Sequence, residues 1–139
     1  ICAEDVYNDF LPEIGTVVLV REPQGSNIRN DSSMYNGYEV TVNYDSMTAK
    51  LIVWGSNRME AVELMRDALD EYIIAGLKTT IPFCRFVMDD ATFIAGDYST
   101  AFVKNRWKSE FPQEVQSIVS ILGALSMNEL NHRRKPQYT

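Results

Sequence analysis

The spacing of hydrophobic residues changes at Gly55, and this change constrains the fold more than any other feature of the sequence. Residues 51–54 form a short, strongly apolar run that is typical of a buried β-strand. From about residue 58 to residue 72, apolar residues recur every three or four positions, which predicts an amphipathic helix. Its apolar face consists of Ala61, Leu64, Met65, Ala68, Leu69 and Tyr72. We expect the strand to be central in a sheet against which the helix packs.

The part of the chain before Gly55 consists of strand segments separated by turns. The end of a strand is expected at residues 1–3, and β-branched or alternating segments predict strands at 16–20, 28–30 and 38–42. Asn36-Gly37 is a strong hairpin signal between two of them. This half of the chain is therefore expected to be mostly antiparallel sheet.

Helix signals dominate after Gly55. Asn57 is placed to cap the first helix, with Glu60 in a capping-box arrangement, and Gly76 is placed to end that helix or the turn after it. A second helix is predicted at about 82–88, capped by Thr80.

A short turn between Asp90 and Gly96 and a third helix at 112–130 follow. The sequence thus predicts an α+β fold in which an antiparallel β-sheet from the N-terminal half packs against helices from the C-terminal half.

The composition excludes several functional classes. A net charge of -6 argues against a nucleic-acid binder or a protein that docks on anionic membranes. The one histidine, His132, lies in a polar tail, so a nucleophile–histidine apparatus is not expected. Cys2 and Cys84 are predicted to be free thiols in a reducing compartment. No apolar run approaches the length of a membrane span.

Few residues stand out as candidates for chemistry. Asp45 places a carboxylate in a polar turn at the head of the 51–54 strand, and Arg29 is displayed on a short strand beside a turn. A surface ion pair is the simpler interpretation of Arg29. The adjacent pairs Glu4-Asp5 and Asp89-Asp90 favour capping or solvation over metal binding.

An ordered set of short motifs resembles a known family. The set includes Ala3-Glu4-Asp5, Phe10-Leu11-Pro12, Tyr44-Asp45-Ser46-Met47, Ala49-Lys50-Leu51-Ile52 and Lys78-Thr79-Thr80. In this order the motifs resemble the C-terminal domain of biotin carboxylase, as found in acetyl-, propionyl- and pyruvate-type biotin-dependent carboxylases. The resemblance covers about residues 1–104.

The resemblance implies a ligase that uses ATP and bicarbonate to carboxylate biotin on a carrier protein. In that family the nucleotide and magnesium bind mainly to a preceding ATP-grasp domain, so this fragment is expected to bind no cofactor and to be inactive by itself. The implied partners are the ATP-grasp domain, the biotin carboxyl carrier protein, a carboxyltransferase component and a second copy in a homodimer. A cytoplasmic location, or the mitochondrial matrix in a eukaryote, is implied.

The resemblance also assigns roles to two residues. Asp45 matches an aspartate on the active-site side of the domain and is expected to orient a catalytic arginine that would lie directly before Ile1. Arg29 matches an arginine at the dimer interface. Cys2 and Asn30 depart from the residues that the family commonly has at those positions, as does Val6.

The resemblance implies three parts: residues 1–104 as the biotin carboxylase C-terminal domain with a truncated first strand, 105–130 as an extra helical segment, and 131–139 as a disordered basic tail. An alternative hypothesis is a non-catalytic interaction module that docks through the 112–130 helix.

Overall fold

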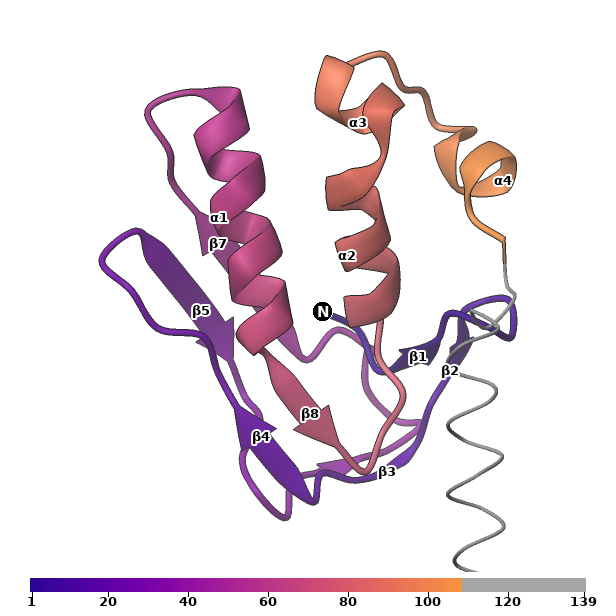
Figure 1. Ribbon diagram of the computed structural model, residues 1–139. Helices are drawn as coiled ribbons and strands as arrows, with labels where there is room; N and C mark the ends of the chain where they lie inside the picture. Colours follow the sequence, from indigo (N-terminus) through magenta and orange to yellow (C-terminus); the bar gives the residue numbers. More distant parts are fainter. Residues whose placement is uncertain (109–139) are drawn as a thin grey trace, which may run out of the picture. The chain divides into compact units, whose positions relative to one another are not determined.

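The computed structural model describes residues 1–108 and consists of short antiparallel strands covered on one face by helices (Figure 1). The strands are β1 (Glu4–Asp5), β2 (Leu11–Pro12), β3 (Gly15–Thr16), β4 (Leu19–Arg21), β5 (Ile28–Ser32), β6 (Glu39–Val40), β7 (Ala49–Val53) and β8 (Ile73–Ala75). The helices are α1 (Arg58–Glu71), α2 (Ile81–Asp89), α3 (Ala91–Ala95) and α4 (Phe102–Arg106). The predicted 112–130 helix and the 131–139 tail lie outside the described residues.

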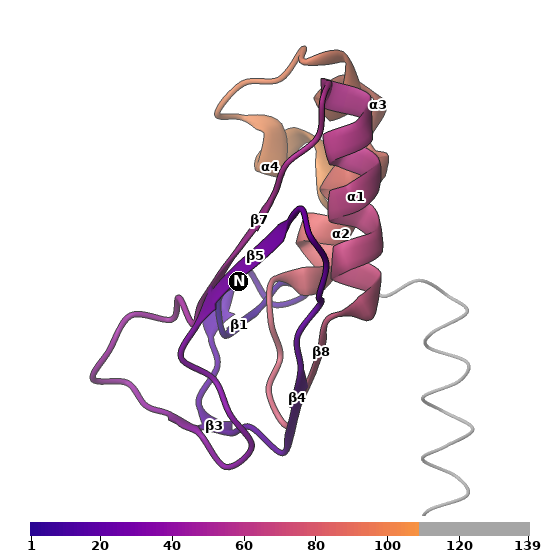
Figure 2. The same cartoon turned by 90° about the vertical axis from the view of Figure 1, so that its left-hand side faces the viewer.

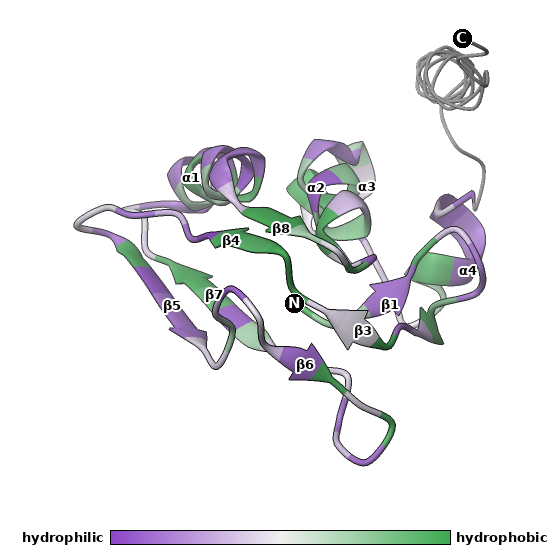
Figure 3. Cartoon of the chain, turned by 90° about the horizontal axis from the view of Figure 1, so that it is seen from below, coloured by the Kyte–Doolittle hydropathy of each residue, from purple (hydrophilic) through white to green (hydrophobic). Residues whose placement is uncertain are grey.

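The strands form antiparallel pairs, which confirms the predicted α+β class. The pairs are β1 with β2, β3 with β6, β4 with β8, and β5 with β7. Figure 2 shows the helices on one side of the strands, and Figure 3 shows that β4 and β8, among the most hydrophobic strands, lie toward α1 and α2. One strand comes from the second half of the chain, because β8 follows α1 and returns to pair with β4.

The sequence did not predict β8, and the reason lies in the residues around it. Tyr72 ends α1 with extended backbone angles, and the β-branched Ile73 and Ile74 then continue as a strand. Gly76, predicted near this point, has a φ of 101° and follows β8. A Cβ atom there would lie 2.4 Å from the carbonyl oxygen of Thr16, so only glycine permits this close approach.

The predicted strand at 16–20 is wrong in detail, because it divides into β3 and β4. Val17 and Val18 connect the two strands. The amide of Val17 donates to the carbonyl of Tyr38 beside β6, and the amide of Val18 donates to the carbonyl of Ala75 of β8. The chain changes partners at this point. Val17 is fully buried and belongs to the core cluster with Met34, Ala49 and Tyr72.

The prediction that residues 51–54 form a buried central strand is also wrong. In β7 burial alternates, and Ile52 is 44% exposed; Trp54, directly after the strand, is 63% exposed. The cause is that only one face of β7 is packed toward the helices and that, among residues 1–108, its ladder partner is β5 alone. Similarly, only Glu39–Val40 of the predicted strand at 38–42 is paired, and Val42 is 80% exposed.

Of the two predicted helix caps, the structure confirms the one at Asn57 and not the one at Thr80. The Asn57 side chain accepts from the amide of Glu60 at 3.0 Å, and Glu60 reaches back to the amide of Ser56 at 2.8 Å, so the predicted capping arrangement is confirmed. Thr80 precedes α2, but its hydroxyl makes no capping bond within that helix. It accepts instead from the amide of Cys2 at 2.9 Å and so fastens the first residues to α2.

Candidate active site

Two segments that are far apart in sequence meet where the first residues cross the 44–47 turn. Cys2 and Met47 form an isolated antiparallel bridge, and the amide of Ala3 donates to the carbonyl of Ser46 at 2.8 Å. The Ser46 hydroxyl also donates to Oε1 of Glu4 at 2.5 Å. The fold therefore joins the Ala3-Glu4-Asp5 and Tyr44-Asp45-Ser46-Met47 motifs through both backbone and side chains.

Asp45 lies at the exposed edge of this junction. Its Oδ1 atom accepts a hydrogen bond from the amide of Met47 at 3.1 Å. This bond closes a turn and so fixes the direction of the carboxylate. Within residues 1–108 its Oδ2 atom has no hydrogen-bond or ion-pair partner. Asp45 thus presents an oriented oxygen that can accept a bond from a cation.

Arg29 lies on a different element and does not contact Asp45. It projects from β5, and its guanidinium makes a two-point contact with Asp31, Nε to Oδ1 and Nη2 to Oδ2, both at 2.8 Å. These bonds raise the pKa of Arg29 and lower the pKa of Asp31, which also feels the charge of Lys50 across the ladder. The ion pair that the simpler interpretation predicted is therefore present, on an exposed face of the sheet.

One polar contact near the first strand was missed from the sequence. Asp5 is 8% exposed, and its Oδ2 atom lies 2.6 Å from Nζ of Lys78, while Oδ1 accepts from the amide of Tyr7. The hydrogen bond from Lys78 is the main cause of a lowered pKa for Asp5. Capping or solvation was expected for this carboxylate: Oδ1 makes a capping-type bond to a backbone amide, whereas Oδ2 is not solvated but paired with Lys78, and this pair ties β1 to the loop before α2. The Lys78-Thr79-Thr80 motif was the available signal for the pair.

Asp90 is the most completely satisfied carboxylate of the described residues. Its Oδ1 atom caps α3 by accepting from the amides of Thr92 and Phe93 and from the Thr92 hydroxyl, as capping predicted. Its Oδ2 atom receives Nε and Nη2 of Arg106 at 2.8 and 2.7 Å. The bond from Thr92, followed by those from Arg106 and the α3 amides, lowers the pKa of Asp90 to about 2.

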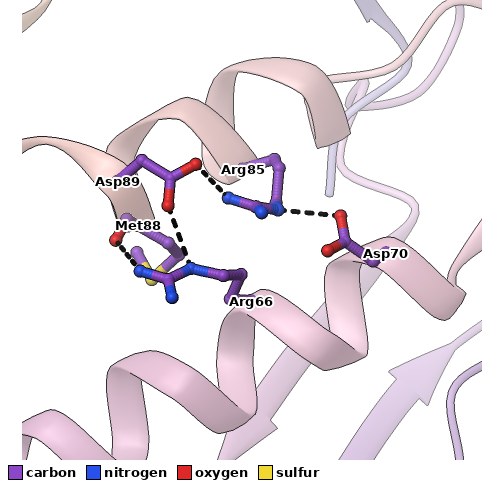
Figure 4. A network of polar contacts seen from close by, with 5 residues as sticks. All are labelled: Arg66, Asp70, Arg85, Met88 and Asp89. Carbon is purple, nitrogen blue, oxygen red and sulfur yellow. Dashed lines mark hydrogen bonds and ion pairs between the residues drawn. The ribbon is translucent and has the colours of Figure 1, made fainter.

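A further polar network joins α1 to α2 (Figure 4). Arg66 of α1 pairs with Asp89 at 2.9 Å and donates to the carbonyl of Met88 at 3.2 Å. Arg85 of α2 pairs with Asp70 at 2.7 Å and also with Asp89. Each charged side chain of the network is paired with one of opposite charge, so the network holds α1 against α2.

The described residues do not fit a nucleotide–magnesium site. Among residues 1–108 no group of three His, Cys, Asp or Glu side chains is arranged to hold a metal. The glycines there are isolated turn glycines, without a loop that cradles phosphate. Burial raises the pKa of Cys84, which makes its thiol a poor nucleophile at neutral pH. In the described part, no helix is long and apolar enough to cross a membrane.

Comparison with known proteins agrees with this geometry. Residues 1–105 match the family model described as the biotin carboxylase C-terminal domain. A pyruvate carboxylase subunit from Methanothermobacter thermautotrophicus is 44% identical over 117 residues, which are 84% of this chain and 24% of that protein. Biotin carboxylase 1 of Bacillus subtilis is 39% identical over 102 residues, 73% of this chain and 23% of that protein.

Solved structures show the same fold. The biotin carboxylase domain dimer of 2-oxoglutarate carboxylase from Hydrogenobacter thermophilus, in complex with MgADP and bicarbonate, superposes with a TM-score of 0.77 at 39% identity. The match covers 81% of this chain and 25% of that one. The biotin carboxylase subunit of a pyruvate carboxylase gives the same values.

The chain therefore belongs to the biotin carboxylase C-terminal domain family. It spans about a quarter of the length of these relatives.

Proposed function

We propose that this chain is the C-terminal part of a biotin carboxylase, whose complete form uses ATP and bicarbonate to carboxylate biotin on a carrier protein. The observation that carries the proposal is the junction of residues 2–4 with the 44–47 turn, where Ser46 bonds to both Ala3 and Glu4. At this junction the motifs shared with the family are hydrogen-bonded to one another, and Asp45 lies at its exposed edge. This arrangement supports the proposal.

In the proposed enzyme Asp45 is a positioning residue. Its held Oδ1 atom and its unpaired Oδ2 atom suit a bond to a guanidinium, and such charge-assisted bonds are short and directional. The arginine it orients is expected directly before Ile1, where the family has a catalytic arginine. Its positive charge would stabilise negative charge on the ureido oxygen of biotin.

The nucleotide and magnesium are assigned to a separate ATP-grasp domain of the same polypeptide. This assignment is supported by the poor fit of residues 1–108 to such a ligand and by the MgADP and bicarbonate named for a relative of which this chain covers only 25%. The isolated chain is proposed to be inactive. In this division residues 1–104 form the biotin carboxylase C-terminal domain.

The complete enzyme is proposed to meet a biotin carboxyl carrier protein and a carboxyltransferase component, and to form a homodimer through the face that displays Arg29. Ile52 stands opposite Arg29 in the ladder and is 44% exposed, and Trp54 is 63% exposed. An exposed aromatic, an aliphatic and an arginine resemble the residues enriched in interfaces. A cytoplasmic or mitochondrial-matrix location accompanies the proposal.

The experiment that tests the function joins this chain to the ATP-grasp half of a relative. Bicarbonate-dependent ATP cleavage, measured with free biotin, is expected in the joined protein and absent from each half. The same joined protein carrying Asp67→Ala, an exposed carboxylate of α1, serves as a matched control with unchanged activity. A folded joined protein without any activity would contradict the proposal.

A further inference from the structure

The direction of the Asp45 carboxylate depends on a turn that its own surroundings hold weakly. Residues 41–46 belong to no helix or strand, and Tyr44 is 84% exposed. Within residues 1–108 Asp45 makes a single hydrogen bond, in which its Oδ1 atom accepts from the Met47 amide at 3.1 Å. Such a surface loop can take several conformations unless another element holds it. The element that holds this turn lies near the start of the chain, in residues 2–4.

Ser46, directly after Asp45, is held through both its backbone and its side chain. Its carbonyl accepts from the amide of Ala3 at 2.8 Å, and its hydroxyl donates to Oε1 of Glu4 at 2.5 Å. The second distance is typical of a hydroxyl bound to a carboxylate, about 2.5–2.7 Å, and such a bond is roughly twice as strong as one between neutral groups. A residue held by its carbonyl alone can still rotate, whereas bonds to two successive residues of one segment fix its orientation.

Glu4 itself belongs to a firmly held strand. It pairs with Pro12 in the β1–β2 ladder, and because side chains alternate along a strand, Glu4 and Asp5 point to opposite faces of β1. Asp5 is 8% exposed and binds Nζ of Lys78 at 2.6 Å, which fastens β1 to the loop before α2. Glu4 therefore reaches Ser46 from a rigid support, which is what precise placement of a site requires.

We propose that Glu4 and Ser46 are positioning residues, because their hydrogen bond sets the direction of the Asp45 carboxylate and, through it, of the arginine that Asp45 orients. This inference rests on the proposed function, which gives Asp45 its role. If the bond served only the fold, its loss would lower stability without a specific effect on Asp45. The two explanations therefore differ in what can be measured at the turn and in the kinetics.

The first test observes the turn directly, by NMR amide exchange in the full chain. Ser46→Ala should lower the protection factor of the Met47 amide several-fold, because the turn that presents Oδ1 of Asp45 is released. Glu4→Gln keeps an acceptor oxygen but removes the charge, so its effect should have the same direction and be smaller. Since this variant preserves the size of the side chain, it decides the test if Ser46→Ala does not fold.

The Tyr7 amide provides a matched reference within the same chain. It donates to Oδ1 of Asp5 at 3.1 Å, just as the Met47 amide donates to Oδ1 of Asp45, and both bonds join residues two positions apart. Its protection factor should stay unchanged in Ser46→Ala, because β1 and the turn after it keep their own contacts. Ser46→Thr, which retains a hydroxyl, should restore most of the protection of Met47.

The second test is a double-mutant cycle in the joined protein, this chain fused to the ATP-grasp half of a relative. Ser46→Ala should lower kcat by about 3- to 10-fold with little change in the KM for ATP, since misplacing a positioning group is costly. In an Asp45→Ala background the same substitution should have no further effect, because the bond acts through Asp45. Ser99→Ala is the control: its exposed hydroxyl accepts from the Ala101 amide at 3.3 Å, and kcat should not change in either background.

Unchanged protection of Met47 in both Ser46→Ala and Glu4→Gln overturns the proposal. A loss of kcat that is equally large with and without Asp45 also overturns it, because the bond would then support only the fold. If the joined protein is inactive, the proposed function fails, while amide exchange still decides whether Glu4 and Ser46 hold the turn. An active joined protein in which Met47 keeps its protection in both variants would reject the positioning role alone.

Discussion

Asp90, on the helix side (α1 to α4), and Asp45, on the strand side (β1 to β8 and their loops), differ in how fully their carboxylates are paired. On the helix side Asp90 has all its acceptor positions used, and Arg58 donates to the carbonyls of Phe93 and Ile94 at the end of α3 while stacking 5.1 Å from the Phe93 ring. On the strand side Asp45 retains an unpaired oxygen. A satisfied polar group stabilises the domain itself, whereas an oriented but unpaired one is available to a partner.

The apolar residues show the same contrast. Trp107, which follows α4, packs edge-on against Phe83 and Phe86 of α2, and its indole N–H donates to the carbonyl of Val6. On the strand side Tyr44 and Trp54 are 84% and 63% exposed. The difference indicates that substitutions on the helix side should change stability, and those on the strand side should change activity or association.

The largest effect is expected from Asp45→Ala in the complete enzyme. Loss of the carboxylate would loosen the arginine, and misplacement by about 1 Å can cost roughly 100-fold in rate, so kcat should fall by about 10- to 100-fold. The KM for ATP should change much less, because the proposal assigns the nucleotide to the ATP-grasp domain. Steady-state kinetics at saturating biotin check this. An equal loss in kcat and in ATP affinity would contradict the placement of Asp45, and Asp45→Glu should recover part of kcat.

The next effect should appear in stability, from Asp90→Asn. The substitution removes the charge that Arg106 pairs with and weakens the α3 cap, so the melting temperature should fall by about 5 °C or more. Asp97→Asn, at an exposed carboxylate close by, is the control and should have little effect.

The pH dependence of Asp90 has a definite sign. Its pKa in the folded protein, about 2, lies below its ordinary value of 3.8, so the native state favours the ionised form. The stabilisation is complete above about pH 4 and is lost as the pH falls toward 2. Thermal unfolding between pH 2 and pH 6 should therefore converge for the wild type and Asp90→Asn at the acid end. Curves that stay parallel would show that Asp90 does not carry this dependence.

The sequence predicted the helix side better than the strand side, for physical reasons. A helix is stabilised by nearby residues, so Asn57 and Glu60 could be recognised as a cap and Asp90 as the start of α3. A strand needs a distant partner. Nothing local shows that Ile73 leaves α1 to pair with Arg21, or that Thr80 serves Cys2 and not its own helix.

For the candidate site, the sequence likewise predicted individual residues but not their contacts with distant ones. The family resemblance named Asp45 and Arg29, but the bond of Ser46 to Glu4 and the pairing of Arg29 with Asp31 depend on tertiary contacts. The alternating exposure of β7 was hidden, because a run such as 51–54 does not reveal which face lacks a covering element. The roles of Asp45 and Arg29 remain predictions.

A smaller effect is expected from Arg29→Glu, and it should appear in association alone. The Arg29–Asp31 pair is exposed, and water and salt screen such pairs so that they contribute little to folding, so the melting temperature should change little. Dimer dissociation of the complete enzyme should become several-fold easier in sedimentation at low concentration. The exchange of charges, Arg29→Glu with Asp31→Arg, is a sharper control: it keeps the local pair and should still weaken the dimer. Full recovery by the exchange would assign Arg29 a local role only.

The smallest effect is expected from Asp70→Asn, and it tests whether polar contacts of the helix side are equal in weight. The Arg85–Asp70 pair joins α1 to α2, but Asp70 is 56% exposed and Arg85 keeps Asp89 as a second partner (Figure 4). Solvent screening then limits the loss to about 0.5 kcal/mol or less in urea unfolding. Asp90→Asn, measured in the same way, should cost clearly more, because the Asp90 side chain is 2% exposed and no second carboxylate replaces it. Equal losses for the two variants would mean that burial does not determine which contacts hold the helix side together.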